Sequence, residues 1–458
     1  MDVLFGSATE AAALLRRGEL SARELTALQL DRVDAANPAV NAVVELRRDV
    51  ALRAADEADA ALARGDDVGP LHGVPITVKE AFDVAGMRTT WGNPAFADFV
   101  AREDSTVVAR LTAAGAVVIG KTNVHEMLAD FGQTANPVHG RTDNPWDPDR
   151  TPGGSTGGGA AALAAGLSFL EYGSDLVGSI RVPAAFCGVY GLKPSVDTVP
   201  LTGFQVPRTT AAPSDWRYLS SVGPLARSAA DLRTALRVTG GPEGPAARAY
   251  SWHLAPPRST RLADFRVGVV LDHRDAPVSG EVGAVLSNAV DALGAAGVEV
   301  VEGWPQGVDP TRDAESFGFQ VGLFFAFQEP EDFAPLSAVV EQEARRMAAR
   351  TAWSRYFEDV DVFLCPTTFT PAFPHDTRPF ADRVIGTPEG DRPYDALPFW
   401  VAHASLPGLP AVSAPVGLTA GGLPVGAQVV GPPHEDDTAI TFAELAADVL
   451  GGYRRPPR

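Results

Sequence analysis

The sequence predicts an α/β fold, a single large domain in which a central β-sheet is covered by helices on both faces. Strand-like and helix-like patterns alternate through the first third of the chain and again within residues 266–303, which is typical of layered α/β proteins. The chain has 458 residues, of which 45% are hydrophobic, so it can bury a large core. No segment repeats at a fixed period, which argues against a solenoid.

Local signals predict the elements of the N-terminal third. Ser21 and Glu24 form a capping-box pair that marks a helix start, and Asn37-Pro38 ends that helix. Residues 41–46 are expected to form a strand and residues 47–65 a long surface helix. Residues 73–80 are expected to form a short buried strand, and residues 104–123 a helix that leads through a glycine turn into another strand.

The alternation continues in the second half of the chain. Residues 266–272 are typical of a strand, and residues 281–303 of a helix followed by a strand. Residues 240–262 and 370–395 are rich in proline, glycine and polar residues, which predicts surface connections rather than a domain boundary. The sequence leaves open whether residues 370–395 form a lid over a site.

Composition and charge exclude several classes of function. The net charge of −19 argues against binding to nucleic acid or to anionic membranes. Cys187 and Cys365 lie in apolar sequence without metal-ligand or disulfide spacing, so both are predicted to be core residues. The N-terminus lacks the features of a signal peptide, and no stretch approaches the roughly 20 apolar residues of a membrane span. We therefore expect a cytoplasmic protein, and leave a homodimer open.

Residues 151–166 read TPGGSTGGGAAALAAG and have several interpretations. A phosphate loop would need a Lys-Ser/Thr pair, and a dinucleotide-binding turn would need a strand where the chain has NPWDPDRTP. The pattern G-x-S-x-G at Gly153–Gly157 matches a nucleophile elbow, but an elbow also needs a preceding strand. A glycine-rich turn leading into a helix of small residues explains this segment at least as well.

A second serine, Ser179, lies in the segment GSDLVGSIRVP. The glycine before it allows the backbone to present several N–H groups to one point, which is how an oxyanion is bound. No histidine lies nearby in the sequence to serve as its base. Lys79, at the end of the apolar segment GVPITVKE, can serve instead if burial lowers its pKa. Alone, Lys79 would be interpreted as a strand-end residue that reaches solvent, but two glycine-flanked serines favour a base.

Together these segments resemble the amidase signature family of Ser-Ser-Lys amide hydrolases. The matching text includes HGVPITVKE, AGAVVIGKTNVHE, NPWDPDRTPGGSTGGGAAALAAG, GSDLVGSIRVPAAFCGVYGLKP and LPGLPAVSAPVGLTAGGLPVGAQVVGP. The resemblance implies a mixed central sheet, a small-molecule amide as substrate, and no cofactor or metal. It divides the single domain into an N-terminal helical region, a catalytic core, a variable substrate-side region and a C-terminal return to the core, at about 1–65, 66–240, 241–400 and 401–458.

The resemblance also assigns roles to residues. Ser179 is the nucleophile, Ser155 relays its proton, and Lys79 is the base, while the Gly154–Ser155 peptide bond is expected to be cis. The oxyanion is expected to bind to the backbone N–H groups of Leu176, Val177, Gly178 and Ser179. Asp175 and Arg181 flank the nucleophile loop within an apolar stretch, so we expect them to pair with each other or to hydrogen-bond with the backbone and thereby hold the shape of the loop. The hydroxyl of Thr156 should support the Lys–Ser network.

The chain departs from the family pattern at two positions. Val177 stands where the family usually has glycine, and a β-branched side chain there restricts the backbone and narrows the approach to the oxyanion site. This departure points to slow hydrolysis, an unusual substrate, or acyl transfer to an amine. Glu80 replaces the commoner aspartate after the lysine, and we expect this change to be tolerated.

Three functions follow from the resemblance. The first is an amide hydrolase, and the second is an acyltransferase or amide synthase that uses the same acyl-enzyme. The third is the amidase component of a glutamine-dependent tRNA amidotransferase, whose Ser-Ser-Leu-Asp-Gln stretch is missing from LSSVGPLARS at 219–228. We expect a small or medium aryl or aliphatic amide as substrate. Residues predicted to line its pocket are His125, Met127, Phe131 and Trp400. Five phenylalanines within 317–328 either line an acyl pocket or, as their helical spacing favours, pack in the core.

Overall fold

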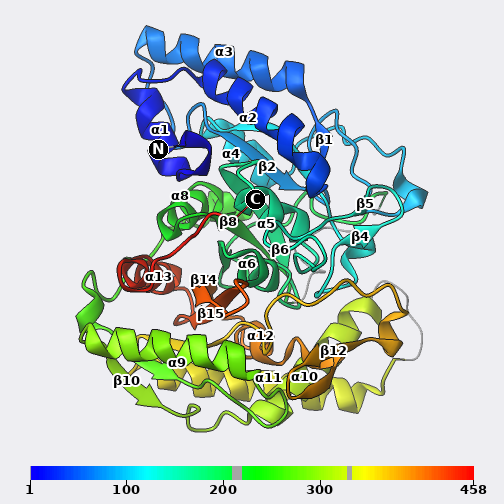
Figure 1. Cartoon of the computed structure of the whole chain (residues 1–458), viewed down its shortest axis with the longest axis vertical. Coiled ribbons are helices and arrows are strands. Elements are labelled where there is room, and N and C mark those ends of the chain that lie inside the picture. Colours follow the sequence, from blue (N-terminus) through cyan, green and yellow to red (C-terminus); the bar gives the residue numbers. More distant parts are fainter. Residues whose placement is uncertain (1, 209–218, 327–332, 458) are drawn as a thin grey trace.

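The computed structural model describes residues 2–208, 219–326 and 333–457, and it is built around one 11-stranded sheet (Figure 1). In spatial order the strands of this sheet are β1 (Val43–Leu46), β3 (Val117–Thr122), β2 (Pro75–Lys79), β6 (Leu170–Asp175), β8 (Ser221–Ala226), β7 (Tyr190–Lys193), β14 (Ala411–Leu418), β15 (Pro424–Val430), β11 (Val362–Pro366), β9 (Arg266–Val269) and β10 (Glu299–Glu302). Two short hairpins lie outside it, formed by β4 (Ala135–Asn136) with β5 (Gly140–Arg141) and by β12 (Val384–Thr387) with β13 (Gly390–Pro393).

The sheet is mixed, as predicted. Strand β2 runs parallel to both β3 and β6, and β9 runs parallel to both β10 and β11. The strands between these two groups, from β6 through β8, β7, β14 and β15 to β11, pair antiparallel. Because this one sheet takes strands from both ends of the sequence, the chain forms a single large α/β domain.

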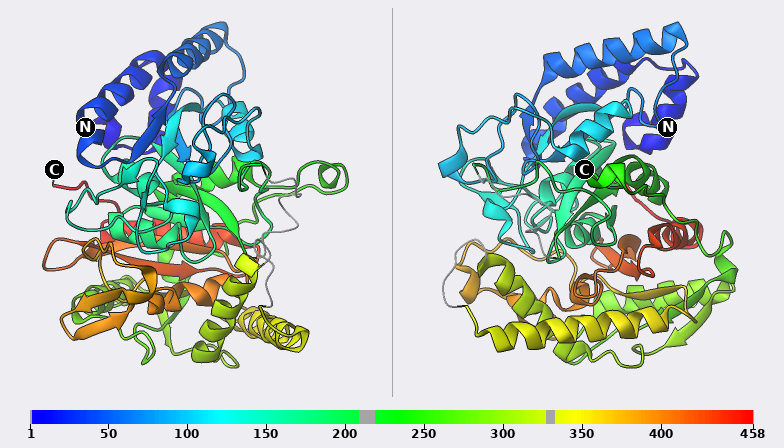
Figure 2. Two further views of the ribbon diagram at one scale, coloured as in Figure 1. Left: turned by 90° about the vertical axis from the view of Figure 1, so that its right-hand side faces the viewer. Right: turned by 180° about the vertical axis from the view of Figure 1, so that it is seen from behind.

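The helices are α1 (Ala8–Arg16), α2 (Ala22–Ala36), α3 (Arg48–Arg64), α4 (Thr106–Ala113), α5 (Gly157–Ala164), α6 (Arg181–Cys187), α8 (Ala229–Thr239), α9 (Gly280–Ala295), α10 (Pro310–Ala326), α11 (Leu336–Tyr356), α12 (Phe399–Ser405) and α13 (Asp436–Leu450). Helices α1–α3 gather at one end of the molecule and α9–α11 at the opposite end, with most of the sheet between them (Figures 1 and 2). Every residue of β2, β6, β7 and β8 is buried, which requires cover on both faces of the sheet.

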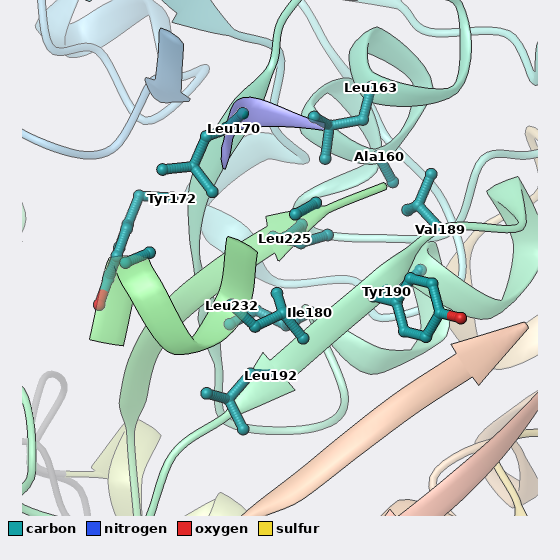
Figure 3. Packing of buried hydrophobic residues seen from close by; sticks show 14 of the residues in the cluster. Ala160, Leu163, Leu170, Tyr172, Ile180, Val189, Tyr190, Leu192, Leu225 and Leu232 are labelled. Atoms are coloured by element: carbon teal, nitrogen blue, oxygen red, sulfur yellow. The ribbon is translucent and has the colours of Figure 1, made fainter. Parts of the chain in front are cut away.

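The core beside strand β6 is built from closely packed elements. Leu170 and Tyr172 of β6 belong to the same hydrophobic cluster as Ala160 and Leu163 of α5, and all four are labelled in Figure 3. Helix α5 begins with three glycines, and a Cβ on Gly159 would lie 2.4 Å from the Glu171 side chain. The glycines therefore let α5 approach the sheet closely, which brings the turn before α5 to the ends of β2 and β6.

Most elements predicted from the sequence are present. The capping box at Ser21 and Glu24 is formed, and the strand expected at 73–80 is β2. A second capping box, of Ser7 with Glu10, was not predicted. The segment 370–395, expected to be a surface connection and left open as a lid, contains the hairpin β12–β13. Both cysteines are buried and free, as predicted.

Candidate active site

Lys79 ends strand β2, and its side chain is fully buried. Nζ donates hydrogen bonds to three hydroxyl oxygens, those of Ser155 at 2.7 Å and of Thr156 and Ser174 at 2.9 Å each. An ammonium group has three protons and no lone pair, so these hydroxyls satisfy its charged form in full. When Nζ loses a proton, a hydroxyl can instead donate to its lone pair, which is the arrangement a general base needs.

The protonation of Lys79 is set by its surroundings. Burial lowers the pKa of Lys79 from 10.5 to about 7, although the negative charge of Asp175, and that of Glu171 when it is ionised, acts in the opposite direction. A lysine with this pKa is substantially neutral at physiological pH. Lys79 therefore has both the contact and the protonation state required of a base.

The sequence contains three lysines, and all of them are buried. Lys121 donates to the backbone oxygen of Arg88 and to the Thr89 hydroxyl, whereas Lys193 donates to two backbone oxygens. Lys79 is the lysine of the three that bonds serine hydroxyls, which distinguishes it from the other buried amines.

Ser155 lies in an irregular segment, residues 151–156, that leads directly into α5. Its peptide bond with Gly154 is cis, as the resemblance implies. A Cβ on Gly154 would lie 2.0 Å from the backbone oxygen of Gln133, so only glycine fits there. Because no strand comes directly before Ser155, this segment is not a nucleophile elbow.

Ser179 has the context that Ser155 lacks, since it lies in the turn between strand β6 and helix α6. The Thr156 N–H donates to the backbone oxygen of Ser179 at 3.2 Å, so the two serine segments are held together. The Ser155 hydroxyl bonds Lys79, and within the described part of the chain no hydrogen bond joins it to the Ser179 hydroxyl. The structure thus brings Lys79 and Ser155 into contact and places Ser179 in the adjoining turn.

A buried ion pair fixes the turn that carries Ser179. Arg181 Nη2 and Nε donate to the two carboxylate oxygens of Asp175 at 2.8 and 2.9 Å, and both side chains are fully buried. Burial acts to raise the pKa of Asp175, but the attraction of Arg181 outweighs it and holds that pKa below its usual value. Arg181 also donates to Val401 O and Ser405 Oγ, which ties the turn to α12. The predicted pairing of Asp175 with Arg181 is confirmed.

The N–H groups around Ser179 are the candidates for binding an oxyanion. The Gly178 N–H donates to Asp175 Oδ1 at 2.9 Å, so the prediction that it is free for an oxyanion does not hold in this structure. Among the residues that the structure describes, the N–H groups of Leu176, Val177 and Ser179 donate to no protein acceptor. Three of the four predicted donors therefore remain available.

Comparison with known proteins decides the family. A model of the Amidase family matches residues 24–329 and 330–440. The chain belongs to the amidase signature family.

Its relatives match along nearly their whole lengths. The chain is 36% identical to an indoleacetamide hydrolase of Bradyrhizobium diazoefficiens, over 97% of this chain and 86% of the relative. It is 33% identical to an acylamidase of Rhodococcus erythropolis, over 95% of this chain and 94% of the relative. Glutamyl-tRNA(Gln) amidotransferase components of Synechococcus species also match, one of them with 32% identity over 97% of this chain and 96% of the relative. The solved structure of 6-aminohexanoate cyclic dimer hydrolase with its substrate is 26% identical, has a TM-score of 0.79, and covers 100% of this chain and 99% of that one.

The predicted pocket residues of this amidase family member fall into two groups. His125, Met127 and Phe131 share one irregular segment that adjoins the Ser155 turn, and the Phe131 ring stacks on Tyr394 with 5.5 Å between the ring centroids. Trp400 has no exposed surface and lies within a second hydrophobic cluster. Trp400 is therefore a core residue in this structure and does not line an open pocket.

The predicted phenylalanine-rich segment coincides with the end of α10. Phe317 is buried against Leu219, Ala402 and Leu406, in a cluster that Leu176 and Val177 also contact. Phe317 thus packs in the core, as its helical spacing favoured, but this core adjoins the candidate oxyanion site. Residues 327 and 328 lie outside the described residues.

Two buried polar residues of the site were missed by the sequence analysis. Ser174 is the third hydroxyl that accepts from Lys79. Glu171 accepts from the hydroxyls of Thr77 and Thr122, and burial raises the pKa of Glu171 to about 8 despite these bonds. The signal in the sequence was that Glu171 and Ser174 follow the apolar stretch before β6 and lie close to Asp175, which indicates a buried polar role.

Glu80, which departs from the family pattern, has a structural role. Its carboxylate accepts the backbone N–H groups of Thr90 and Trp91. These bonds join the end of β2 to the following loop, so the longer side chain is accommodated, as expected.

Over residues 2–208, 219–326 and 333–457, no helix is long and apolar enough to cross a membrane. The same residues hold no cluster of three or more histidine, cysteine, aspartate or glutamate side chains arranged to bind a metal ion.

Below about pH 7, kcat/KM should fall as Lys79 becomes protonated, and we call this part of the pH profile the acid limb. Replacing Ser174 by alanine should shift the acid limb to lower pH. The variant removes an acceptor that favours the ammonium form of Lys79, so the pKa of Lys79 should fall below its value of about 7. We also expect kcat to drop by about tenfold because Lys79 is held less well. The measurement is kcat/KM against pH from 5 to 9.

Ser168 provides a matched control, since within the described part of the chain its buried hydroxyl bonds two backbone groups, Thr77 N and Leu170 O, and no side chain. Ser168→Ala should reduce stability without moving the acid limb. An unchanged limb in Ser174→Ala would show that the Ser174 hydroxyl does not act on Lys79.

Proposed function

We propose that this protein hydrolyses carboxylic amides through an acyl-enzyme on Ser179, with Ser155 and Lys79 as its proton relay. The observation that carries the proposal is the 2.7 Å hydrogen bond between the buried Lys79 Nζ and Ser155 Oγ, beside the turn that holds Ser179. The family of the chain and the hydrolases among its relatives support this reaction class.

In the first half of the reaction, Ser179 Oγ attacks the carbonyl carbon of the amide. Its proton passes to Ser155 Oγ, whose own proton passes to neutral Lys79 Nζ. The C–N bond then breaks, and the proton returns along the same route to the departing nitrogen, so that ammonia or an amine leaves. The product of these steps is an ester between the acyl group and Ser179.

In the second half, water takes the place of Ser179 as the nucleophile. Its proton enters the relay, and the acyl–oxygen bond breaks as the proton returns to Ser179. The carboxylic acid leaves and the enzyme is restored. The relay uses side chains and water only.

The negative charge of each tetrahedral intermediate would be met by backbone N–H groups. The groups of Leu176, Val177 and Ser179 are the available donors, and the bond from Gly178 to Asp175 holds their turn in place. Donors fixed in this way need no reorganisation during the reaction, which is the main advantage of an oxyanion site.

The side chains beside these N–H donors are apolar and therefore suit an apolar acyl group. Leu176 and Val177 contact a cluster that includes Leu219 and Phe317, all with apolar side chains. We therefore propose small or medium aryl or aliphatic amides as substrates, in keeping with the indoleacetamide named for one hydrolase relative.

The alternatives use the same acyl-enzyme and differ in what attacks it. An amine in place of water would give acyl transfer or amide synthesis. The relatives named as components of a tRNA amidotransferase are transferase proteins, but the chain has LSSVGPLARS at 219–228 in place of the Ser-Ser-Leu-Asp-Gln stretch expected of them. We therefore favour the free-standing hydrolase.

The proposal is tested with a panel of aryl and aliphatic amides and esters, using mass spectrometry of products and of the intact protein. Acid plus ammonia, together with a mass increase equal to the acyl group on the peptide containing Ser179, is the expected result. A parallel reaction with hydroxylamine or an added amine measures acyl transfer. Formation of the new amide in preference to the acid would favour the transferase, and an acyl group on any other residue would refute the assignment of the nucleophile.

Replacing Val177 by glycine should change the rate or the range of acyl groups accepted. The Val177 side chain packs in the hydrophobic cluster beside the oxyanion donors. Its removal therefore leaves more space for an acyl group next to these donors. We expect the ratio of kcat/KM for bulky and small acyl groups to change by about tenfold. The Val177→Ala variant should give an intermediate ratio, and identical ratios in all three proteins would remove the reason to connect Val177 with altered chemistry.

A further inference from the structure

The cis turn that carries Ser155 is framed by a second segment, residues 130–134. The Gly154 N–H donates to Phe131 O at 3.1 Å, and the Thr134 hydroxyl donates to Gly153 O at 2.8 Å. A Cβ on Gly154 would lie 2.8 Å from Asp130 O as well as 2.0 Å from Gln133 O. The position of Ser155 therefore depends on where residues 130–134 lie.

Asp130 anchors this framing segment. Its residue is only 2% exposed, and its carboxylate accepts from the Gly132 N–H at 2.8 Å, from the Tyr394 hydroxyl at 2.6 Å and from the Arg383 guanidinium. The nearest ring nitrogen of His125 lies 4.0 Å away. A buried carboxylate is tolerated only when it is paired in this manner, so these contacts hold both partners tightly to Asp130.

Arg383 and Tyr394 flank the β12–β13 hairpin. Both lie within residues 370–395, the segment for which the sequence did not decide whether it forms a lid. The Tyr394 ring stacks on Phe131, and the Arg383 guanidinium lies 5.3 Å from the Tyr394 ring centroid. The side-chain amide of Gln133 bonds both the N–H and the carbonyl of Asp376, at 2.7 and 2.9 Å. This segment is therefore fastened to the frame of the Ser155 turn by side chains and rings.

We propose that Asp130, Arg383 and Tyr394 form a latch through which the β12–β13 segment positions Ser155 for proton transfer. The latch rests on the proposed function, because it acts through Ser155 and not on the substrate. The three side chains are positioning residues. Loosening them lets the Gly153–Ser155 turn drift away from Lys79 and Ser179, while the ion pair of Asp175 with Arg181 keeps the nucleophile turn in place.

The latch predicts a selective loss of amide cleavage. Ser155 must return a proton to the nitrogen of an amide, whereas a p-nitrophenolate leaves an ester without one. A displaced Ser155 should therefore lower kcat for an amide more than for the p-nitrophenyl ester of the same acid. We expect Tyr394→Phe to reduce the amide-to-ester ratio of kcat by about threefold and Asp130→Asn by at least about tenfold, with KM nearly constant.

The controls separate positioning from folding. Tyr394→Phe keeps the stacked ring and removes only the hydroxyl, so it tests the latch even if Asp130→Asn does not fold. Arg378→Gln, which removes the ion pair between the exposed Arg378 side chain and the partly buried Asp376 in the same segment, should leave the ratio unchanged. Amide and ester rates that fall together, or an unchanged ratio in an active Tyr394→Phe, would overturn the latch alone. A wild-type protein without amide hydrolysis would overturn the proposed function and the latch with it.

Discussion

Replacing Ser179 by alanine should abolish both amide hydrolysis and covalent labelling by a fluorophosphonate. The variant removes the oxygen that forms the acyl-enzyme, and no other group in the proposed relay can replace it. Loss of a nucleophile in a serine hydrolase costs at least about 10⁴-fold in kcat, which places the residual rate near the limit of detection. Ser179 lies in a turn whose shape is set by Asp175 and Arg181, so the variant should fold normally.

The matched variant is Ser155→Ala, because the two serines give opposite results under the two interpretations of the glycine-rich segments. If Ser155 is the relay, its loss should leave weak turnover and slow labelling at Ser179. If instead Ser155→Ala cannot be labelled while Ser179→Ala still can, Ser155 is the nucleophile and the G-x-S-x-G interpretation is correct. Proteolysis on the carboxyl side of glutamate, followed by mass spectrometry, distinguishes the cases directly, because Glu171 lies between the two serines in the sequence.

Much of the candidate site could be predicted because its residues occur in contiguous segments. Lys79 ends an apolar strand, and Ser155 and Ser179 each follow a glycine, so the local sequence reports their settings. The pairing of Asp175 with Arg181 was also predictable, because one short turn brings their side chains together. In each case the information lies within one short stretch of the chain.

The remaining features depend on contacts between distant segments. Ser174 reaches Lys79 because β6 pairs with β2 in parallel, with Val78 opposite Tyr172, and a single sequence does not reveal this register. The Gly178 N–H donates to Asp175 and is therefore not available to an oxyanion, and this bond depends on the path of the turn rather than on residue type. Trp400 was predicted to line the pocket, but its burial is decided by packing against segments far away in the sequence.

The position of the hairpin β12–β13 also depends on contacts with distant segments and could not be predicted from its local sequence. Its sequence is rich in proline and polar residues, so local propensity indicates only a connection. Its fixed position comes from Asp130 and Phe131, which lie far earlier in the chain. Such a pairing of a buried carboxylate with Arg383 and Tyr394 is visible only once the segments are placed in space.

Replacing Lys79 by methionine should lower kcat/KM by about 10³-fold or more, because the relay then has no final proton acceptor. The rate of the wild-type protein should rise with pH through about 7 and level off above it, since only the neutral amine accepts a proton. The residual activity of Lys79→Met should lack this limb. Misfolding is not expected to explain the loss, because methionine removes an ammonium whose burial costs on the order of 5 kcal/mol at low pH.

The free energy of burying the Lys79 ammonium depends on pH, so the stability of the protein as a function of pH gives a second measurement. The pKa of Lys79 is lowered in the folded state, so between about pH 7 and 10.5 the unfolded chain binds more protons than the folded one. The free energy of unfolding of the wild-type protein should therefore rise relative to that of Lys79→Met as the pH is raised through this window. A difference that is constant with pH would mean that Lys79 titrates normally and is not the base.

Lys121→Met is the matched control, since Lys121 is also buried, has a pKa lowered to about 8, and does not contact the serines. This variant should keep the limb near pH 7 and most of the activity. Because the chain has only three lysines, protein labelled with ¹³C at the lysine side chains should give three sets of side-chain signals, and the set missing from Lys79→Met identifies Lys79. If that signal titrates near 10, or if Lys121→Met and not Lys79→Met loses the limb, Lys79 is not the base. A signal that titrates at the pH of the kinetic limb would connect the buried amine to the proton transfer itself.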